Sequence, residues 1–93
     1  MKGKVAIVTG GARDIGRQVS LKLAAAGAKV CINYFGNEEL AKETLQMVKD
    51  AGGEAIIVHG DMTKSADVKK VVSACTDAYG TVVHVLVNVA GGL

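Results

Sequence analysis

The 93-residue chain has no proline, no tryptophan and only two tyrosines and one phenylalanine, and neither charge predominates. The absence of proline excludes a proline-rich spacer, and so few rings exclude the stacking platforms that bind single-stranded nucleic acid. Eleven basic and nine acidic residues give a net charge of +2, too balanced to predict a nucleic-acid or membrane partner. With 49% hydrophobic residues, the chain is also too apolar for disorder. We therefore expect a single small folded domain.

Cysteine and histidine are equally scarce. Cys31 and Cys75 lie far apart without C-x-x-C spacing, which fits a reducing compartment better than a disulfide framework, and we interpret both as small buried hydrophobes. His59 and His84 lie on separate apolar runs without a ligand-spaced partner, so no metal site is predicted. The first apolar run, residues 5–8, is too short for a signal peptide or membrane span, and we expect a cytoplasmic protein.

Apolar runs and helical stretches alternate along the chain. Four runs rich in β-branched residues occupy residues 4–9, 29–34, 55–59 and 82–89, and helical spacing occupies residues 14–26, 37–51 and 64–79. None of the runs alternates cleanly between apolar and polar residues, which is typical of strands buried on both faces of a parallel sheet.

The three helical stretches have apolar positions and recognisable ends. The apolar positions are Ile15, Val19, Leu23 and Ala26 on one face of the first helix, Leu40, Leu45, Met47 and Val48 in the second, and Val68, Val71, Val72 and Cys75 facing inward in the third. Asn37 and Ser65 are predicted N-caps, and Gly27, Gly52 and Gly80 are expected to end the helices in left-handed conformations.

The order β-α-β-α-β-α-β predicts an α/β fold of one domain over residues 1–93. Right-handed crossovers give a Rossmann-type doubly wound parallel sheet with helices on both faces and strand order 3-2-1-4. Such sheets bind ligands beyond the carboxyl ends of their strands, at the switch point between the first and fourth strands.

A glycine-rich turn, TGGARDIG at residues 9–16, joins the first strand to the first helix. Here backbone N–H groups and the helix N-terminus can approach a phosphate. Neither G-x-G-x-x-G nor G-x-x-x-x-G-K-[ST] is present, so a P-loop NTPase is not predicted. The alternative is an ordinary βα turn that needs glycine.

The other strands also end in polar or glycine-rich segments. The second strand ends at Asn33 and Tyr34, Asp61 and Met62 follow the third, and the segment with Asn88, Ala90 and Gly91 follows the fourth. Because the carboxyl ends of parallel strands meet along one edge, we expect these segments and the glycine turn to form one site.

Three segments resemble the short-chain dehydrogenase/reductase family, most of all its 3-oxoacyl-carrier-protein reductases and glucose dehydrogenases. The turn at residues 9–16 resembles the family's T-G-x-x-x-G-x-G, LVNVAG at residues 86–91 resembles L-V-N-N-A-G, and Asp61 matches an acidic residue beside the adenine. The likeness covers essentially the whole chain. It implies hydride transfer between NADP(H) or NAD(H) and a small-molecule carbonyl or alcohol.

The resemblance assigns cofactor-binding roles across the edge. It implies that Gly10 and Gly16 allow the close turn, that Ile15 meets the diphosphate, and that Asp61 and Met62 flank the adenine, with Ala12, Tyr34, Asn88, Ala90 and Gly91 completing the site. Arg13 matches an arginine that meets the adenosine 2′-phosphate, although it could instead be a solvent-exposed residue. Asn33 lacks the carboxylate that would repel this phosphate, so NADP(H) is favoured over NAD(H).

Two residues depart from the family pattern. Asp14 replaces the second glycine of the turn, and we expect its carboxylate to cap the free N–H groups of the helix rather than repel the diphosphate. Val89 replaces the second asparagine of L-V-N-N-A-G, so its side-chain hydrogen bonds are lost.

The chain contains no Tyr-x-x-x-Lys, which supplies acid/base chemistry in the family, so no catalytic residue is predicted. In the family this motif, the catalytic serine and the substrate loop follow the fourth strand. The apolar fourth strand would also form an uncovered edge. We therefore expect the cofactor-binding, N-terminal part of a longer, homo-oligomeric enzyme.

The alternative is a stand-alone nucleotide-binding half-domain without activity. A methyltransferase and a flavodoxin-like receiver fit the residues at the strand ends less well.

Overall fold

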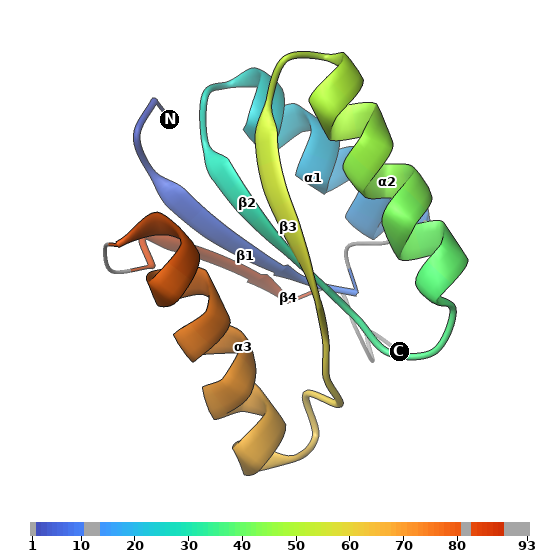
Figure 1. Ribbon diagram of the computed structural model, residues 1–93, viewed down its shortest axis with the longest axis vertical. Helices are drawn as coiled ribbons and strands as arrows, with labels where there is room; N and C mark the ends of the chain where they lie inside the picture. The colour runs from blue at the N-terminus through green and yellow to red at the C-terminus, as the bar shows by residue number, and fades with distance from the viewer. Residues whose placement is uncertain (1, 11–13, 81–82, 89–93) are drawn as a thin grey trace.

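The computed structural model describes residues 2–10, 14–80 and 83–88 and shows four parallel strands alternating with three helices (Figure 1). The elements are β1 (Val5–Thr9), α1 (Asp14–Ala25), β2 (Lys29–Tyr34), α2 (Glu38–Asp50), β3 (Glu54–His59), α3 (Ser65–Tyr79) and β4 (Val85–Asn88). The strands form one sheet in the order β3-β2-β1-β4, and every pairing is parallel. The predicted fold class and strand order are confirmed.

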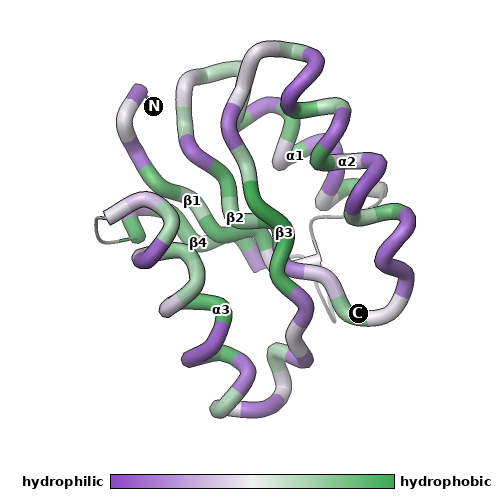
Figure 2. Tube along the Cα trace, in the orientation of Figure 1, coloured by the Kyte–Doolittle hydropathy of each residue, from purple (hydrophilic) through white to green (hydrophobic). Residues whose placement is uncertain are grey.

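Two apolar clusters hold the layers together. α1 and α2 cover one face of the sheet around Val8, Val30 and Ile32, while α3 covers the other around Ile7 and Val58 (Figure 1). All five residues of β1 are buried, as the continuous apolar run predicts for a central strand. Hydrophobic residues accordingly concentrate on the strands (Figure 2).

Among the predicted helix ends that the structure describes, which leave out the Asp14 side chain, all but one follow the predicted capping chemistry. The Asn37 side chain accepts a hydrogen bond from Leu40 N at 3.2 Å, and Gly27, Gly52 and Gly80 have positive φ. The prediction of Ser65 as an N-cap is wrong: Lys64 occupies that position, without a side-chain cap, and Ser65 is the first helical residue. The start of α3 is fixed instead by the preceding turn, where Lys64 N donates to Asp61 O at 2.9 Å.

Three positions predicted to face inward are exposed. Ile15, with 69% of its surface exposed, lies in the first turn of α1, which begins at the end of the sheet rather than over it. Ala26 follows the last residue of α1 and is exposed in the turn to β2. Val72 is 40% exposed because one residue turns a helix by about 100°, which takes it away from the buried stripe of Val71 and Cys75.

β4 forms the edge of the sheet beside β1 and is shorter than the predicted run at residues 82–89. Residues 82 and 89 lie outside the described residues, while residues 83 and 84 precede the strand. At this point Val5 N donates to His84 Nδ1 at 3.1 Å, and His84 N donates to Val5 O at 2.8 Å. A side chain thus accepts the first N–H of β1. Along β4 itself, Leu86 is 64% exposed, as expected for an uncovered strand.

We expect a His84→Ala substitution to lower the free energy of unfolding by about 1 kcal/mol, because it leaves the N–H of the fully buried Val5 unpaired. His84→Asn is the matched control, since its Oδ1 occupies nearly the same place as Nδ1 and also accepts a hydrogen bond. Urea unfolding followed by circular dichroism measures both variants. Equal losses for the two would show that the hydrogen bond contributes nothing.

Candidate functional site

The carboxyl ends of β1 and β4 are joined directly by side chains. Thr9 and Asn88 are partners in the parallel register, and the Thr9 hydroxyl, on a residue only 3% exposed, lies 2.8 Å from Asn88 Oδ1. The same hydroxyl lies 3.3 Å from the carbonyl oxygen of Val87. This contact fixes the exposed Asn88 at the point where the helices on either side of the sheet diverge, the switch point of the fold.

The glycine turn begins at the end of β1. Gly10 has a φ of +69°, a left-handed conformation that residues with a side chain rarely adopt. α1 starts four residues later, at Asp14, so the free N–H groups of its first turn lie at the carboxyl edge. Gly16 is buried and Ile15 exposed. Ala12, Arg13, Ala90 and Gly91 lie outside the described residues, as does the side chain of Asp14.

The side chain at the end of β2 points into the protein. Asn33 is 2% exposed, and its Nδ2 donates to the carbonyl oxygens of Val58, at 3.3 Å, and Gly60, at 3.1 Å. Its amide therefore binds the backbone at the end of β3. Whether position 33 influences the choice of cofactor stays a prediction.

Three rings gather just beyond Asn33, on the ends of β2 and β3. The Tyr34 and His59 rings make an edge-on contact with centroids 5.4 Å apart, and Phe35 lies 5.5 Å from the same imidazole. Tyr34 is half-buried against the α1–α2 side of the sheet, whereas Phe35 is 67% exposed. The described part of the edge therefore presents an apolar surface next to its polar turn.

The turn after β3 carries Asp61 and Met62. Asp61 Oδ1 accepts hydrogen bonds from the hydroxyl of Thr63, at 2.7 Å, and from its backbone N–H, at 3.0 Å. These bonds favour the ionised carboxylate and lower the pKa of Asp61 below its usual value. Met62 is partly buried against the α3-side cluster. The turn thus presents a carboxylate that stays charged at neutral pH beside a hydrophobic side chain.

Sequence reasoning missed two residues that build this turn. Asp67, in the first turn of α3, accepts a hydrogen bond from Asp61 N at 2.8 Å, and Thr63 binds the Asp61 carboxylate. The signal was present, because an acidic residue in the first turn of a helix has free N–H groups nearby. It could not show that the donor would be the backbone N–H of Asp61, in the turn that precedes the helix.

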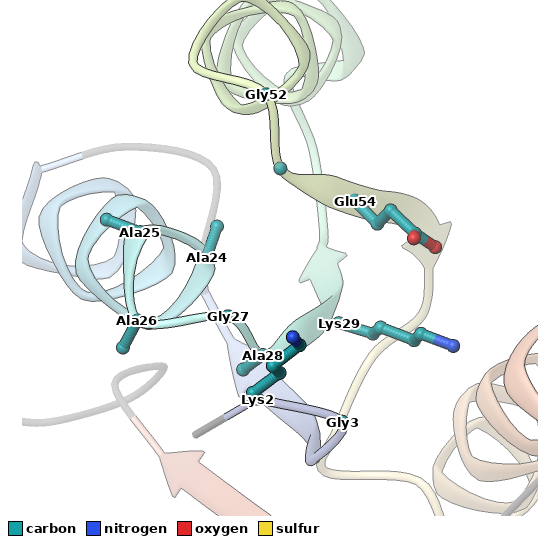
Figure 3. Close-up of a pocket in the computed structure, with 11 residues that line it drawn as sticks. Lys2, Gly3, Ala24, Ala25, Ala26, Gly27, Ala28, Lys29, Gly52 and Glu54 are labelled. Atoms are coloured by element: carbon teal, nitrogen blue, oxygen red, sulfur yellow. The ribbon is translucent and has the colours of Figure 1, made fainter.

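A pocket of about 500 Å³ lies elsewhere, at the amino ends of the strands (Figure 3). Small residues at positions 24–28 and Gly52 and Gly53 form much of its lining, with the Lys2, Lys29 and Glu54 side chains beside it. Parallel doubly wound sheets bind their ligands at the opposite edge. We therefore take the carboxyl edge, and not this pocket, as the candidate site.

The residues at the carboxyl edge fit a dinucleotide. A positive-φ glycine four residues before the 12-residue α1 suits a diphosphate, and a charged carboxylate with an apolar neighbour suits a base. Among the described residues, no group of three or more His, Cys, Asp and Glu side chains could hold a metal ion. None of the described helices has the length and apolar character needed to cross a bilayer.

Together the fold and this edge are typical of nucleotide-binding α/β proteins. The family model for short chain dehydrogenases matches residues 4–93. Since this is nearly the whole chain, the protein belongs to the short-chain dehydrogenase family.

Similar proteins agree with this assignment. The chain is 41% identical over 85 residues to the short-chain dehydrogenase/reductase homolog YusS of Bacillus subtilis, a match covering 91% of this chain and 77% of YusS. A dehydrogenase/reductase from Sinorhizobium meliloti superposes with a TM-score of 0.93 at 33% identity over 98% of this chain. Escherichia coli hydroxysteroid dehydrogenase gives 0.87 at 29% identity over 94%. The chain spans 36% of the length of each of these two solved structures.

Proposed function

We propose that the chain is the NADP(H)-binding part of an oxidoreductase that transfers hydride between this cofactor and a carbonyl or alcohol substrate. The observation that carries the proposal is the convergence of three segments at one edge of a short-chain dehydrogenase fold. These are the Gly10 turn, the Thr9–Asn88 contact and the Asp61 turn. The sequence likeness favours a reductase similar to the 3-oxoacyl-carrier-protein and glucose-dehydrogenase groups.

Each segment has a part in holding the cofactor. The N–H groups of the first turn of α1 bind the diphosphate, and Gly10 lets the backbone come close. The Asp61 carboxylate accepts from the exocyclic amine of adenine, beside Met62. Asn88, held by Thr9, lines the ribose near the nicotinamide.

The bound nicotinamide supplies the hydride, while the chain's own residues bind and orient the cofactor. The sequence offers no Tyr-x-x-x-Lys to donate a proton, so this part of the protein holds the cofactor without completing the reaction. We propose that residues following the fourth strand in a longer parent provide the proton donor and the substrate loop.

We expect Arg13→Ala to weaken NADPH binding by about tenfold or more while changing NADH binding by less than about threefold, because only NADPH has the 2′-phosphate. Fluorescence titration of each nucleotide gives the two dissociation constants. Lys22→Ala is the matched control, since it removes an exposed charge from the last turn of α1. Equal losses for both nucleotides would remove the assignment of NADP(H).

The second candidate is a nucleotide-binding half-domain without activity, favoured by the missing Tyr-x-x-x-Lys. Intact mass of the protein purified from its natural source, followed by assay of NADPH-dependent carbonyl reduction, separates the two. A longer, active protein supports the reductase. A protein of 9.5 kDa that binds NADPH without turnover supports the half-domain.

A further inference from the structure

The backbone that joins β3 to α3 is held by a side chain from the neighbouring strand. Asn33 Nδ2 donates to the carbonyl oxygens of Val58 and Gly60 at 3.3 and 3.1 Å. In the opposite direction, Gly60 N donates to Tyr34 O at 2.9 Å. Both the last residues of β3 and the glycine after it are therefore fixed to the end of β2.

A second side chain holds the next residue from the helix side. Asp67 Oδ2 accepts from Asp61 N at 2.8 Å, and Lys64 N donates to Asp61 O at 2.9 Å. With its backbone fixed in this way, Asp61 uses one carboxylate oxygen, Oδ1, for both bonds from Thr63. Its Oδ2 has no hydrogen-bond partner within the described part of the chain.

Gly60 fits tightly between these two side chains. A Cβ atom at this position would lie 3.1 Å from Val71 Cγ2 and 3.6 Å from both Asn33 Nδ2 and Asp67 Cβ. The buried Val71 thus leaves the turn little room to shift. The turn has one well-defined position relative to β2 and α3.

We propose that Asn33 and Asp67 are positioning residues that clamp the turn at residues 58–61, so that Asp61 presents its carboxylate to adenine in a fixed place. This inference rests on the proposed cofactor-binding function. Asp67 is bound to a backbone N–H and Asn33 is buried, so both act through the turn rather than on the nucleotide. A fixed acceptor distinguishes adenine, which offers an amine donor, from hypoxanthine, which offers a carbonyl oxygen at the same position.

Titration of the chain with ADP and with IDP, by calorimetry, tests the clamp. We expect the unsubstituted chain to bind ADP about tenfold more tightly than IDP. Asp67→Ala should weaken ADP binding by about fivefold and reduce the preference to about twofold, because the Asp61 N–H loses its acceptor. Asp67→Asn keeps an acceptor oxygen and should restore the preference. Asp77→Ala, which removes an exposed carboxylate from the same helix, should leave it unchanged.

Gly60→Ala provides a second variant in case Asp67→Ala does not fold. Its added methyl group requires Val71 or the turn to shift by a few tenths of an ångström. Because Val71 is buried in the core, we expect the turn to shift and the preference for ADP over IDP to fall. Suppose that the unsubstituted chain prefers ADP over IDP and a folded variant keeps the same preference. The clamp is then wrong, and the proposed function stands. If the unsubstituted chain binds neither nucleotide, both are wrong. Equal binding of ADP and IDP by the unsubstituted chain removes the role of Asp61 and the clamp with it.

Discussion

An Asn33→Asp substitution should destabilise the fold by on the order of 3 kcal/mol at neutral pH, without converting the protein to NADH. A carboxylate has no proton to donate, and at this position it would face the carbonyl oxygens of Val58 and Gly60. The site is 2% exposed, so water cannot solvate the new charge. In many dinucleotide-binding folds an acidic residue at the end of the second strand binds the adenosine ribose, so the type of residue alone would suggest that Asn33→Asp favours NADH.

The loss should depend on pH in a defined direction. Burial beside two acceptors raises the pKa of the introduced carboxyl group in the folded state, so the variant should regain stability as the pH falls and the group becomes a donor. Urea unfolding at pH 7 and pH 5 measures this. Asn37→Asp is the control, because that exposed N-cap needs only an acceptor and should change by less than about 0.5 kcal/mol. A stable Asn33→Asp variant that prefers NADH would contradict the structure at this position.

The second large effect should appear at alkaline pH, where we expect the free energy of unfolding to fall because three buried groups, two thiols and a phenol, ionise more easily in the unfolded chain. Burial, together with a smaller contribution from the adjacent Cys75 thiol, raises the pKa of the Cys31 thiol from 9.0 to about 12. Burial also raises the pKa values of Cys75 and Tyr79. All three stay protonated in the fold and ionise more easily when it opens. Their contribution to stability is therefore complete below about pH 9 and declines above it.

For Cys31 alone, we expect the free energy of unfolding to fall by on the order of 2 kcal/mol between pH 9 and pH 11. Cys31→Ala isolates this effect from the titration of lysines. The variant should start less stable, because the sulfur is lost from the core, yet show a shallower decline with pH. Urea midpoints across this range give the two slopes. Identical slopes would show that Cys31 does not contribute, and rapid alkylation of the folded protein at pH 8 would contradict its burial.

The sheet could be predicted from the sequence because each strand is a continuous apolar run, a local pattern that recurs four times along the chain. Val5, Ala6, Ile7 and Val8 form a continuous apolar run, and burial on both faces is the simplest environment for such a strand. Alternation with helical stretches then restricts the sheet to parallel order with right-handed crossovers. The ends of the helices are harder to predict. Serine is a common N-cap residue, but the turn before α3 places Lys64 at the N-cap and Ser65 inside the helix.

The candidate site was predictable in position but not in its internal contacts. Strand ends locate Asn33 and Asp61 at one edge, whereas the sequence does not show which way each side chain points. A strand turns alternate residues to opposite faces, and Asn33 falls on the face with Cys31, toward α3. The clamp by Asp67 and the bond from Val5 to His84 depend on partners brought together by the fold. The second of these joins residues 79 apart in sequence, so no local pattern predicts it.

The central place of β1 also affects how the chain comes to fold during synthesis. β1 is made first, and its pairing with β2 needs only the residues up to Tyr34. Its other edge stays open until β4 is made, since the strands are joined through residues 84–88. Closing so long a loop carries an entropic cost that shorter-range pairings avoid. During synthesis, the edge of β1 that faces β4 can therefore be paired only after nearly all of these 93 residues have been made.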